Sequence, residues 1–231
     1  MLPASLQRIL ELAGETVVLD VGGWAKPLSR ADWVLDLMPY ETRGAYGRLD
    51  SSPERFTRDT WIQRDICDHQ PFPFDDRQID FAVCSQTLED IRDPVWVCSE
   101  LNRIARAGYI EVPSRLEEQS YGVHGPWVGW SHHRWLVDVT PGRIDFVFKP
   151  GVLQGRDDCQ FPAGFVDTLS PEERAQTLFW EGQLGFGERI FMTPEELDGY
   201  LSEFVATHRP PAALTTRARG RLSRLAHRRR S

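Results

Sequence analysis

The sequence lacks the features that would mark a membrane, secreted or zinc-binding protein. No run approaches 18 consecutive apolar residues, so we expect no membrane span. The N-terminus has neither a basic start nor a long apolar stretch, which argues against a secretory signal. The cysteines form no CxxC pair and are scattered through the chain: Cys67, Cys84, Cys98 and Cys159. We therefore expect a cytoplasmic globular protein with reduced thiols and no metal site.

Length and composition indicate one folded domain. The chain has 231 residues, of which 41% are hydrophobic and 26% charged, so it is neither disordered nor fibrous. At this size the buried core needs no disulfide or metal. We expect a single domain over residues 1–206, with a cofactor half at 1–114, an acceptor-side loop and hairpin at 115–150 and C-terminal helices at 151–206.

Charge is distributed unevenly along the chain. The net charge is −7, yet residues 204–231 contain eight arginines and no acidic residue. The acidic body is a poor partner for nucleic acid, so we expect such binding only through a basic, flexible tail at 207–231. That tail could also contact an anionic membrane or the acidic body of a neighbour, or serve only as a solubilising end.

Short apolar runs alternate with helical patterns in the first half. Residues 5–13 read as an amphipathic helix capped by Ser5, and residues 94–106 as a second helix with Pro94 in its first turn. The expected strands are 16–21, 33–37, 61–64, 79–84 and 108–112. Strands of this kind between helices predict an α/β fold, Rossmann-like and doubly wound, with a mostly parallel sheet.

The pattern changes after Pro113. Residues 134–139 and 143–149 flank a Thr-Pro-Gly turn, which predicts a C-terminal antiparallel β-hairpin. Capping boxes with a following proline begin at Ser170 and Thr193, which predicts two added helices.

Two acidic positions stand at strand ends. Asp20-Val-Gly-Gly follows the first strand, where glycines let the backbone approach a ligand, and Asp36 closes the second strand, where a carboxylate can bind ribose hydroxyls. The alternatives are a tight strand-exit turn and an ordinary surface acid.

A third segment adds further motifs, which together with these two positions form an ordered set. It contains Arg64-Asp65-Ile66, Pro71-Phe-Pro-Phe-Asp75, Ile79-Asp80-Phe-Ala-Val-Cys84-Ser85, Leu88-Glu89-Asp90, Glu100-Leu-Asn-Arg103 and Gly108-Tyr-Ile-Glu-Val-Pro-Ser114. In this order, residues 15–150 resemble the class I S-adenosylmethionine-dependent methyltransferases, in particular the type-11 methyltransferase domains.

The resemblance implies roles for individual residues. Asp20, Gly22 and Gly23 would lie under the methionine part of S-adenosylmethionine. Asp36 would hold the ribose hydroxyls, with Leu37 and Met38 beside the adenine. Asp65 would accept the adenine amino group next to Ile66, and Ser85 would lie near the transferable methyl.

The sequence departs from that family at three places. Residues 22–32 leave little room for a crossover helix, the glycine loop is followed by the bulky Trp24, and no histidine follows the fourth strand. These departures favour a second hypothesis, a catalytically silent binding or scaffolding protein. A third is a nicotinamide-dependent oxidoreductase, although the GxGxxG motif is missing.

The segment from Glu111 to Trp135 carries the candidate catalytic residues. Tyr121, His124 or His133 could act as the base for an acceptor hydroxyl or amine. These side chains could equally serve packing and loop hydrogen bonds. We expect no metal site from His124, His132 and Cys159, because carboxylate support and ligand spacing are missing. The leading hypothesis is O- or N-methylation of a small-molecule acceptor, whose identity the sequence leaves open, as it does the oligomeric state.

Overall fold

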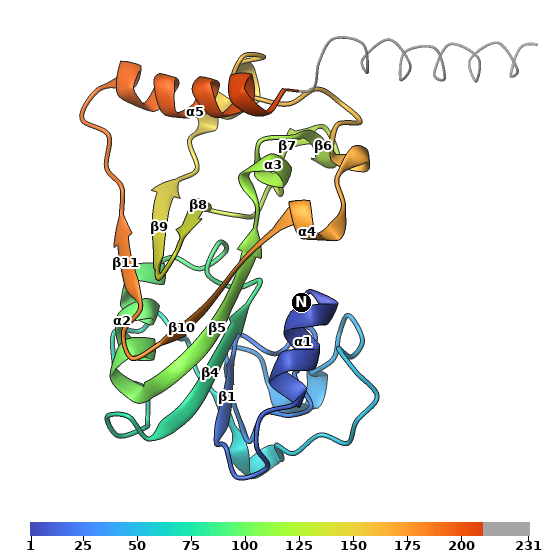
Figure 1. Cartoon of the computed structure of the whole chain (residues 1–231), viewed down its shortest axis with the longest axis vertical. Coiled ribbons are helices and arrows are strands. Elements are labelled where there is room, and N and C mark those ends of the chain that lie inside the picture. The colour runs from blue at the N-terminus through green and yellow to red at the C-terminus, as the bar shows by residue number, and fades with distance from the viewer. Residues whose placement is uncertain (210–231) are drawn as a thin grey trace, which may run out of the picture. The chain divides into compact units, whose positions relative to one another are not determined.

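A computed structural model describes residues 1–209. Figure 1 traces the chain and labels its elements, and the contacts of the described residues define two compact units. The first contains residues 1–115, 132–149 and 170–190, and the second contains residues 116–131, 150–169 and the described residues from Phe191 onward. The single domain over 1–206 stays a prediction. Beyond Arg209, the basic tail expected at 207–231 lies outside the described residues.

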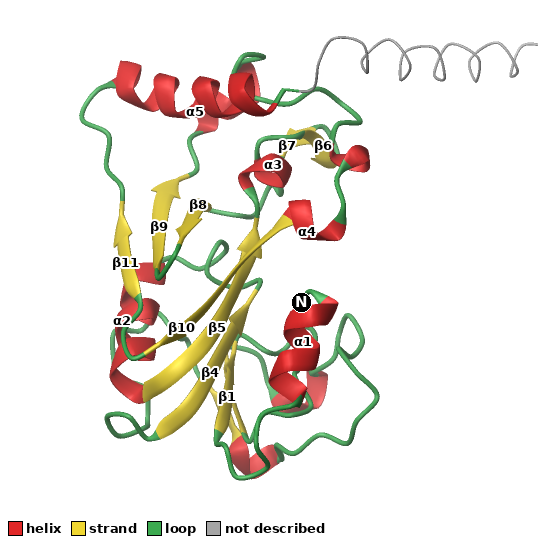
Figure 2. Ribbon diagram, viewed as in Figure 1, coloured by secondary structure: helices red, strands yellow, loops and turns green. Residues whose placement is uncertain are grey.

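A six-stranded sheet forms the centre of the first unit, with strand order β10-β5-β4-β1-β2-β3. Figure 2 labels four of these strands, β10, β5, β4 and β1. Five strands are parallel, and β10 pairs antiparallel with β5. The strands are β1 (Val18–Val21), β2 (Trp33–Asp36), β3 (Trp61–Gln63), β4 (Ile79–Ser85), β5 (Ala105–Pro113) and β10 (Ala175–Glu181). The predicted α/β, mostly parallel sheet is confirmed.

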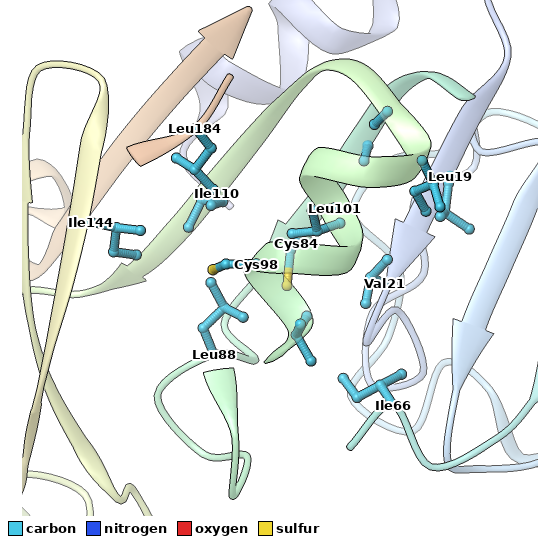
Figure 3. Close-up of a cluster of buried hydrophobic side chains, with 14 of the residues drawn as sticks. Leu19, Val21, Ile66, Cys84, Leu88, Cys98, Leu101, Ile110, Ile144 and Leu184 are labelled. Carbon is cyan, nitrogen blue, oxygen red and sulfur yellow. The ribbon is translucent and has the colours of Figure 1, made fainter. Parts of the chain in front are cut away.

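The strands are apolar on both faces because both faces are covered. All four residues of β1 are buried. Helix α1 (Pro3–Leu10) contributes Ile9 to the cluster on one face, and α2 (Pro94–Ile104) contributes Cys98 and Leu101 to the other. Figure 3 shows the Cys84 and Cys98 side chains among the apolar residues of this second cluster. Burial on two faces explains why these runs lack a polar–apolar alternation.

The connection from β1 to β2 contains no helix, although the two strands are parallel. Hydrogen bonds from polar side chains fix the conformation of this connection instead. Asp32 accepts the backbone amide of Val18 at 2.9 Å, and Arg30 donates to the carbonyls of Ala13 and Thr16 at 2.7 and 2.9 Å. Single 3₁₀ turns follow at η1 (Tyr40–Thr42) and η2 (Arg58–Thr60).

A second, three-stranded sheet belongs to the same unit and has the order β11-β9-β8. Strands β8 (Trp135–Thr140) and β9 (Arg143–Phe148) form the expected antiparallel hairpin, with Gly142 at φ 74° in the turn. Strand β11 (Gly185–Glu188) pairs parallel with β9.

One local expectation was wrong, and another was confirmed over a single turn only. Ser5 lies inside α1, which begins at Pro3 after Leu2, so proline in the first turn rather than a serine cap starts this helix. The capping box at Ser170 forms, but α4 (Pro171–Arg174) lasts only one turn. The chain then enters β10, because pairing with the free edge of β5 outweighs local helix propensity.

The second unit combines a small hairpin, short turns and one long helix. Its elements are the end of α3 (Arg115–Glu118), β6 (Tyr121–His124), β7 (Trp127–Val128), η3 (Gly151–Gly155), η4 (Val166–Thr168) and α5 (Pro194–His208). Buried Gln119 donates to the carbonyls of Cys159 and Leu201 at 2.9 and 3.1 Å, which fastens the 150–169 segment to α5.

The described residues contain four free, buried cysteines. Within residues 1–209, no cluster of three or more metal-ligating side chains could hold a metal ion. None of the helices in this part of the chain is long and apolar enough to pass through a bilayer.

Candidate functional site: the carboxyl edge of the sheet

Parallel pairing brings the ends of β1, β2 and β4 to one edge. Val21 faces Leu35 on β2 and Cys84 on β4, so the next residues of these strands, Gly22, Asp36 and Ser85, follow at the same edge. Open α/β sheets bind ligands at this edge.

Asp36 is the best-positioned acceptor at this edge. Its side chain is 7% exposed, and the backbone amides of Trp24 and Met38 donate to Oδ2 and Oδ1 at 2.9 and 2.8 Å. Burial raises the pKa of this carboxyl, and the backbone hydrogen bonds oppose the rise. A carboxylate has about four acceptor sites, and backbone amides, including that of Leu37, occupy three of them, so Asp36 keeps capacity for a ligand hydroxyl.

Asp20 has a different environment, beneath the loop that follows β1. It is 4% exposed, and its Oδ2 accepts the amide of Leu28 at 2.9 Å. Burial raises the pKa of this carboxyl to about 7, and the nearby Asp36 charge adds to the rise. A Cβ on Gly23 would lie 2.2 Å from Asp20 Oδ2, so the loop backbone packs directly on the carboxyl. In this arrangement Asp20 holds the loop.

Gly22 meets two constraints at once. Its φ of 79° is in the left-handed region, and a Cβ there would lie 2.2 Å from Thr87 Oγ1. Its amide donates to the carbonyl of Leu35 at 2.9 Å, which joins the turn to β2. The sequence indicated the glycine but not its neighbour Thr87.

Asp65 follows β3 and is already ion-paired. Its Oδ1 accepts the amide of Cys67 at 2.8 Å, and its Oδ2 lies 2.8 Å from Arg92. Ile66 beside it is buried in the core. Sequence reasoning missed Arg92, because no local spacing connects it with a residue so far away in the chain.

Ser85 lies next to a second residue that the sequence did not single out for this role, Glu111. The two side-chain oxygens, Ser85 Oγ and Glu111 Oε1, are 3.5 Å apart. Glu111 is 2% exposed and accepts hydrogen bonds from Tyr109 Oη at 2.5 Å and the Leu2 amide at 2.7 Å. Burial acts to raise the pKa of this carboxyl, but the hydrogen bonds outweigh it and hold the pKa below the ordinary value.

Leu37 and Met38, the expected adenine neighbours, follow β2. Leu37 is 61% exposed, which leaves an apolar side chain available for contact. The backbone carbonyl of Met38 accepts Trp61 Nε1 at 2.9 Å, which fixes the chain after Asp36 against β3.

The three candidate bases belong to different units. Tyr121 and His124 are on β6 of the second unit; Tyr121 is 39% exposed, and His124 Nδ1 lies 2.9 Å from Ser131 Oγ. His133 is in the first unit, before β8, with its ring centroid 4.5 Å from that of His132. Their catalytic role stays a prediction.

The edge residues suit an adenosyl group. The carboxylates of Asp36 and Asp65 retain acceptor capacity for ribose hydroxyls and an amino group, Gly22 forms the tight turn after β1, and Leu37 offers an apolar surface. Within residues 1–209, nothing at this edge resembles a phosphate loop, and a sulfonium cofactor needs none.

The strand order, with five parallel strands and one antiparallel edge strand, defines a Rossmann-like α/β fold. No protein-family model matches the sequence, and no curated protein matches it.

Comparison with solved structures finds similar chains of low identity. One is from the complex of the Haloferax volcanii Trm112 methyltransferase activator with a methyltransferase (21% identity, 48% of this chain and 50% of that chain, TM-score 0.36). Others are S-adenosylmethionine-dependent methyltransferases from Mesorhizobium loti (14%, 63% and 62%, 0.37) and Aquifex aeolicus (17%, 48% and 63%, 0.34). The chain thus spans half to 63% of these proteins.

Proposed function

We propose that this protein is an S-adenosylmethionine-dependent methyltransferase that methylates an oxygen or nitrogen atom of a small-molecule acceptor. One observation carries the proposal: the nearly buried Asp36 carboxylate at the end of β2, beside the Gly22 turn that follows β1. This pair provides hydroxyl acceptors and a tight turn at the ligand-binding edge of the sheet.

The cofactor would supply an activated methyl group on a positively charged sulfur. In the proposal, Asp36 binds the ribose, Asp65 the adenine amino group, and Leu37 packs against the ring. The negative charge of Asp36 favours a cation at this edge. Holding the acceptor in line with the methyl provides most of the rate enhancement, so a strong base is not obligatory.

Calorimetry on the full chain tests the proposal. We expect S-adenosylmethionine and its demethylated product to bind with similar micromolar affinity, and NAD not to compete with them. Absence of binding by both adenosyl ligands, in a sample whose circular dichroism and thermal transition show that it is folded, would refute the proposal. Binding of NAD without binding of either adenosyl ligand would favour an oxidoreductase.

A catalytically silent binding protein is the second candidate, and Trp24 favours it. Its amide binds Asp36, and its indole Nε1 donates to Thr42 at 2.9 Å, so a bulky side chain is fixed beside the ribose acceptor. Adenosyl binding without transfer of a labelled methyl group to any component of a metabolite extract would support this candidate. Labelling of one component would eliminate it. A cytoplasmic location is part of the leading proposal.

A further inference from the structure

The second unit contains a cavity of about 410 Å³, whose wall includes none of the sheet-edge residues described above. Its wall includes Tyr121, Gln154, Asp157, Gln160, Pro162 and Arg209. The volume is in the range of small-molecule sites in proteins. Every wall residue among residues 1–209 belongs to the second unit.

The lining is unusually rich in planar polar groups. It offers one carboxylate (Asp157), one guanidinium (Arg209) and two carboxamides (Gln154 and Gln160), together with the ring and hydroxyl of Tyr121. The acid and the base balance each other, so the cavity has no excess charge. Its polar groups include both donors and acceptors.

The two carboxamides are held in place by backbone groups. The Gln154 side chain accepts a hydrogen bond from the Val128 amide at 3.0 Å and donates one to the Val128 carbonyl at 3.4 Å. It thus pairs with both backbone groups of Val128, as the backbone of a neighbouring strand would. Gln160 is 9% exposed and donates to the Leu153 carbonyl at 3.4 Å. Each amide has two N–H groups and two acceptor sites, so each retains hydrogen-bonding capacity for a ligand.

Phe161 anchors the wall segment between Gln160 and Pro162. It is fully buried, stacks on Phe165 with ring centroids 4.2 Å apart, and contacts Phe204 of α5 edge-on at 6.2 Å. Its neighbours in the sequence therefore have defined positions before a ligand arrives. A preformed wall lowers the entropic cost of binding.

We infer that this cavity binds an uncharged polyhydroxylated small molecule of the sugar type. A hydroxyl group both donates and accepts, and neighbouring hydroxyls match the paired atoms of a carboxylate, a guanidinium or a carboxamide. The Tyr121 ring adds a flat apolar surface. A phosphate ligand would call for several cations and no carboxylate, and an apolar ligand for a mainly hydrophobic wall.

Apart from Tyr121, one of the three candidate bases, the cavity shares no residue with the proposed methyl-transfer site, and sugar binding requires no cofactor. Its test is therefore performed without an adenosyl ligand. If adenosyl ligands do not bind, the inferred sugar site is unaffected. If no sugar binds, the proposed methyl transfer is unaffected.

The experiment is saturation-transfer NMR on the full chain with glucose, galactose, mannose, inorganic phosphate and glutamate as separate probes. At least one sugar should bind, with a dissociation constant in the millimolar range, and neither phosphate nor glutamate should. Asp157→Asn and Gln160→Leu should each weaken sugar binding about three- to tenfold, the effect of losing one ligand hydrogen bond.

The matched control is Asp167→Asn, which neutralises an exposed acid of the same unit outside the cavity wall. It should leave binding unchanged. Asp157 is also exposed, so its variant should fold even if Gln160→Leu does not. No sugar binding by the unmodified chain, equal affinity in the Asp157→Asn variant, or stronger binding of phosphate or glutamate would each overturn the inference.

Discussion

The backbone amide of Trp24 donates a 2.9 Å hydrogen bond to Oδ2 of Asp36 across the β1–β2 connection. This bond joins the turn after β1 to the end of β2, so the turn is fixed although no crossover helix is present. The contact places the expected methionine and ribose sites beside each other without relying on a helix.

Replacing Asp36 with asparagine should weaken adenosyl binding. The amide keeps the size of the carboxyl but has one acceptor oxygen instead of two and no charge. Loss of a charge-assisted hydrogen bond costs about 1.5–3 kcal/mol, which is about ten- to 150-fold in affinity measured by calorimetry. Asp59→Asn, at an exposed position in η2, is the control and should bind normally. Equal affinities would remove Asp36 from the site.

Asp20 should make the stability of the fold depend on pH. Its pKa is about 7 in the folded protein and near 3.8 in the unfolded chain, so between these values the folded state holds an extra proton. Protonated Asp20 therefore makes its full contribution to the free energy of unfolding below about pH 4, and this contribution is lost as the pH rises to about 7. Each pKa unit corresponds to about 1.4 kcal/mol, so the total is at most about 4 kcal/mol.

Asp20→Asn isolates this contribution, because asparagine does not titrate. In urea unfolding, the free energy of unfolding of the variant relative to the unmodified protein should increase from pH 4.5 to pH 8. The asparagine oxygen can still accept the Leu28 amide. A difference that stays constant across this pH range would show that Asp20 ionises normally.

Gly23→Ala should destabilise the loop above Asp20. The new Cβ would lie 2.2 Å from Asp20 Oδ2, so loop or carboxyl must move, at a cost of about 1–3 kcal/mol. At Gly14, no atom lies within 4 Å of a new Cβ, so Gly14→Ala should be neutral or slightly stabilising. Thermal unfolding of both variants tests the contrast; similar transition temperatures would contradict it.

Gln119→Leu should destabilise the second unit. The carbonyls of Cys159 and Leu201 would each lose a buried donor, at about 1–3 kcal/mol for each unsatisfied group. Hydrogen exchange of α5 should therefore become faster. Gln183→Leu at an exposed position is the comparison and should leave exchange in α5 unchanged. Unchanged protection in Gln119→Leu would show that other contacts hold the helix.

The sequence predicted the parallel strands because their apolar, β-branched runs are short and bounded by turns. It did not predict β10 (Ala175–Glu181). Polar residues Gln176 and Thr177 interrupt its apolar pattern, and its partner β5 is distant in the sequence. Such a strand forms mainly because it pairs with the exposed edge of β5, and the local sequence pattern contains no information about that edge.

The candidate site shows the same limit. The sequence was sufficient to predict that Gly22 and Asp36 lie at one edge, because both follow or close predicted parallel strands, and parallel strands end at the same edge of a sheet. The Arg92–Asp65 ion pair and the contact between Gly23 and Asp20 depend on loop conformation, so only coordinates reveal them.

The late position of β10 in the sequence has a consequence for biosynthesis. During translation, β5 is made long before residues 175–181 leave the ribosome, so one margin of the nascent sheet stays open in the meantime. Exposed strand margins invite pairing with other chains. Production of this protein should therefore benefit from chaperones that shield β5 until β10 has been synthesised.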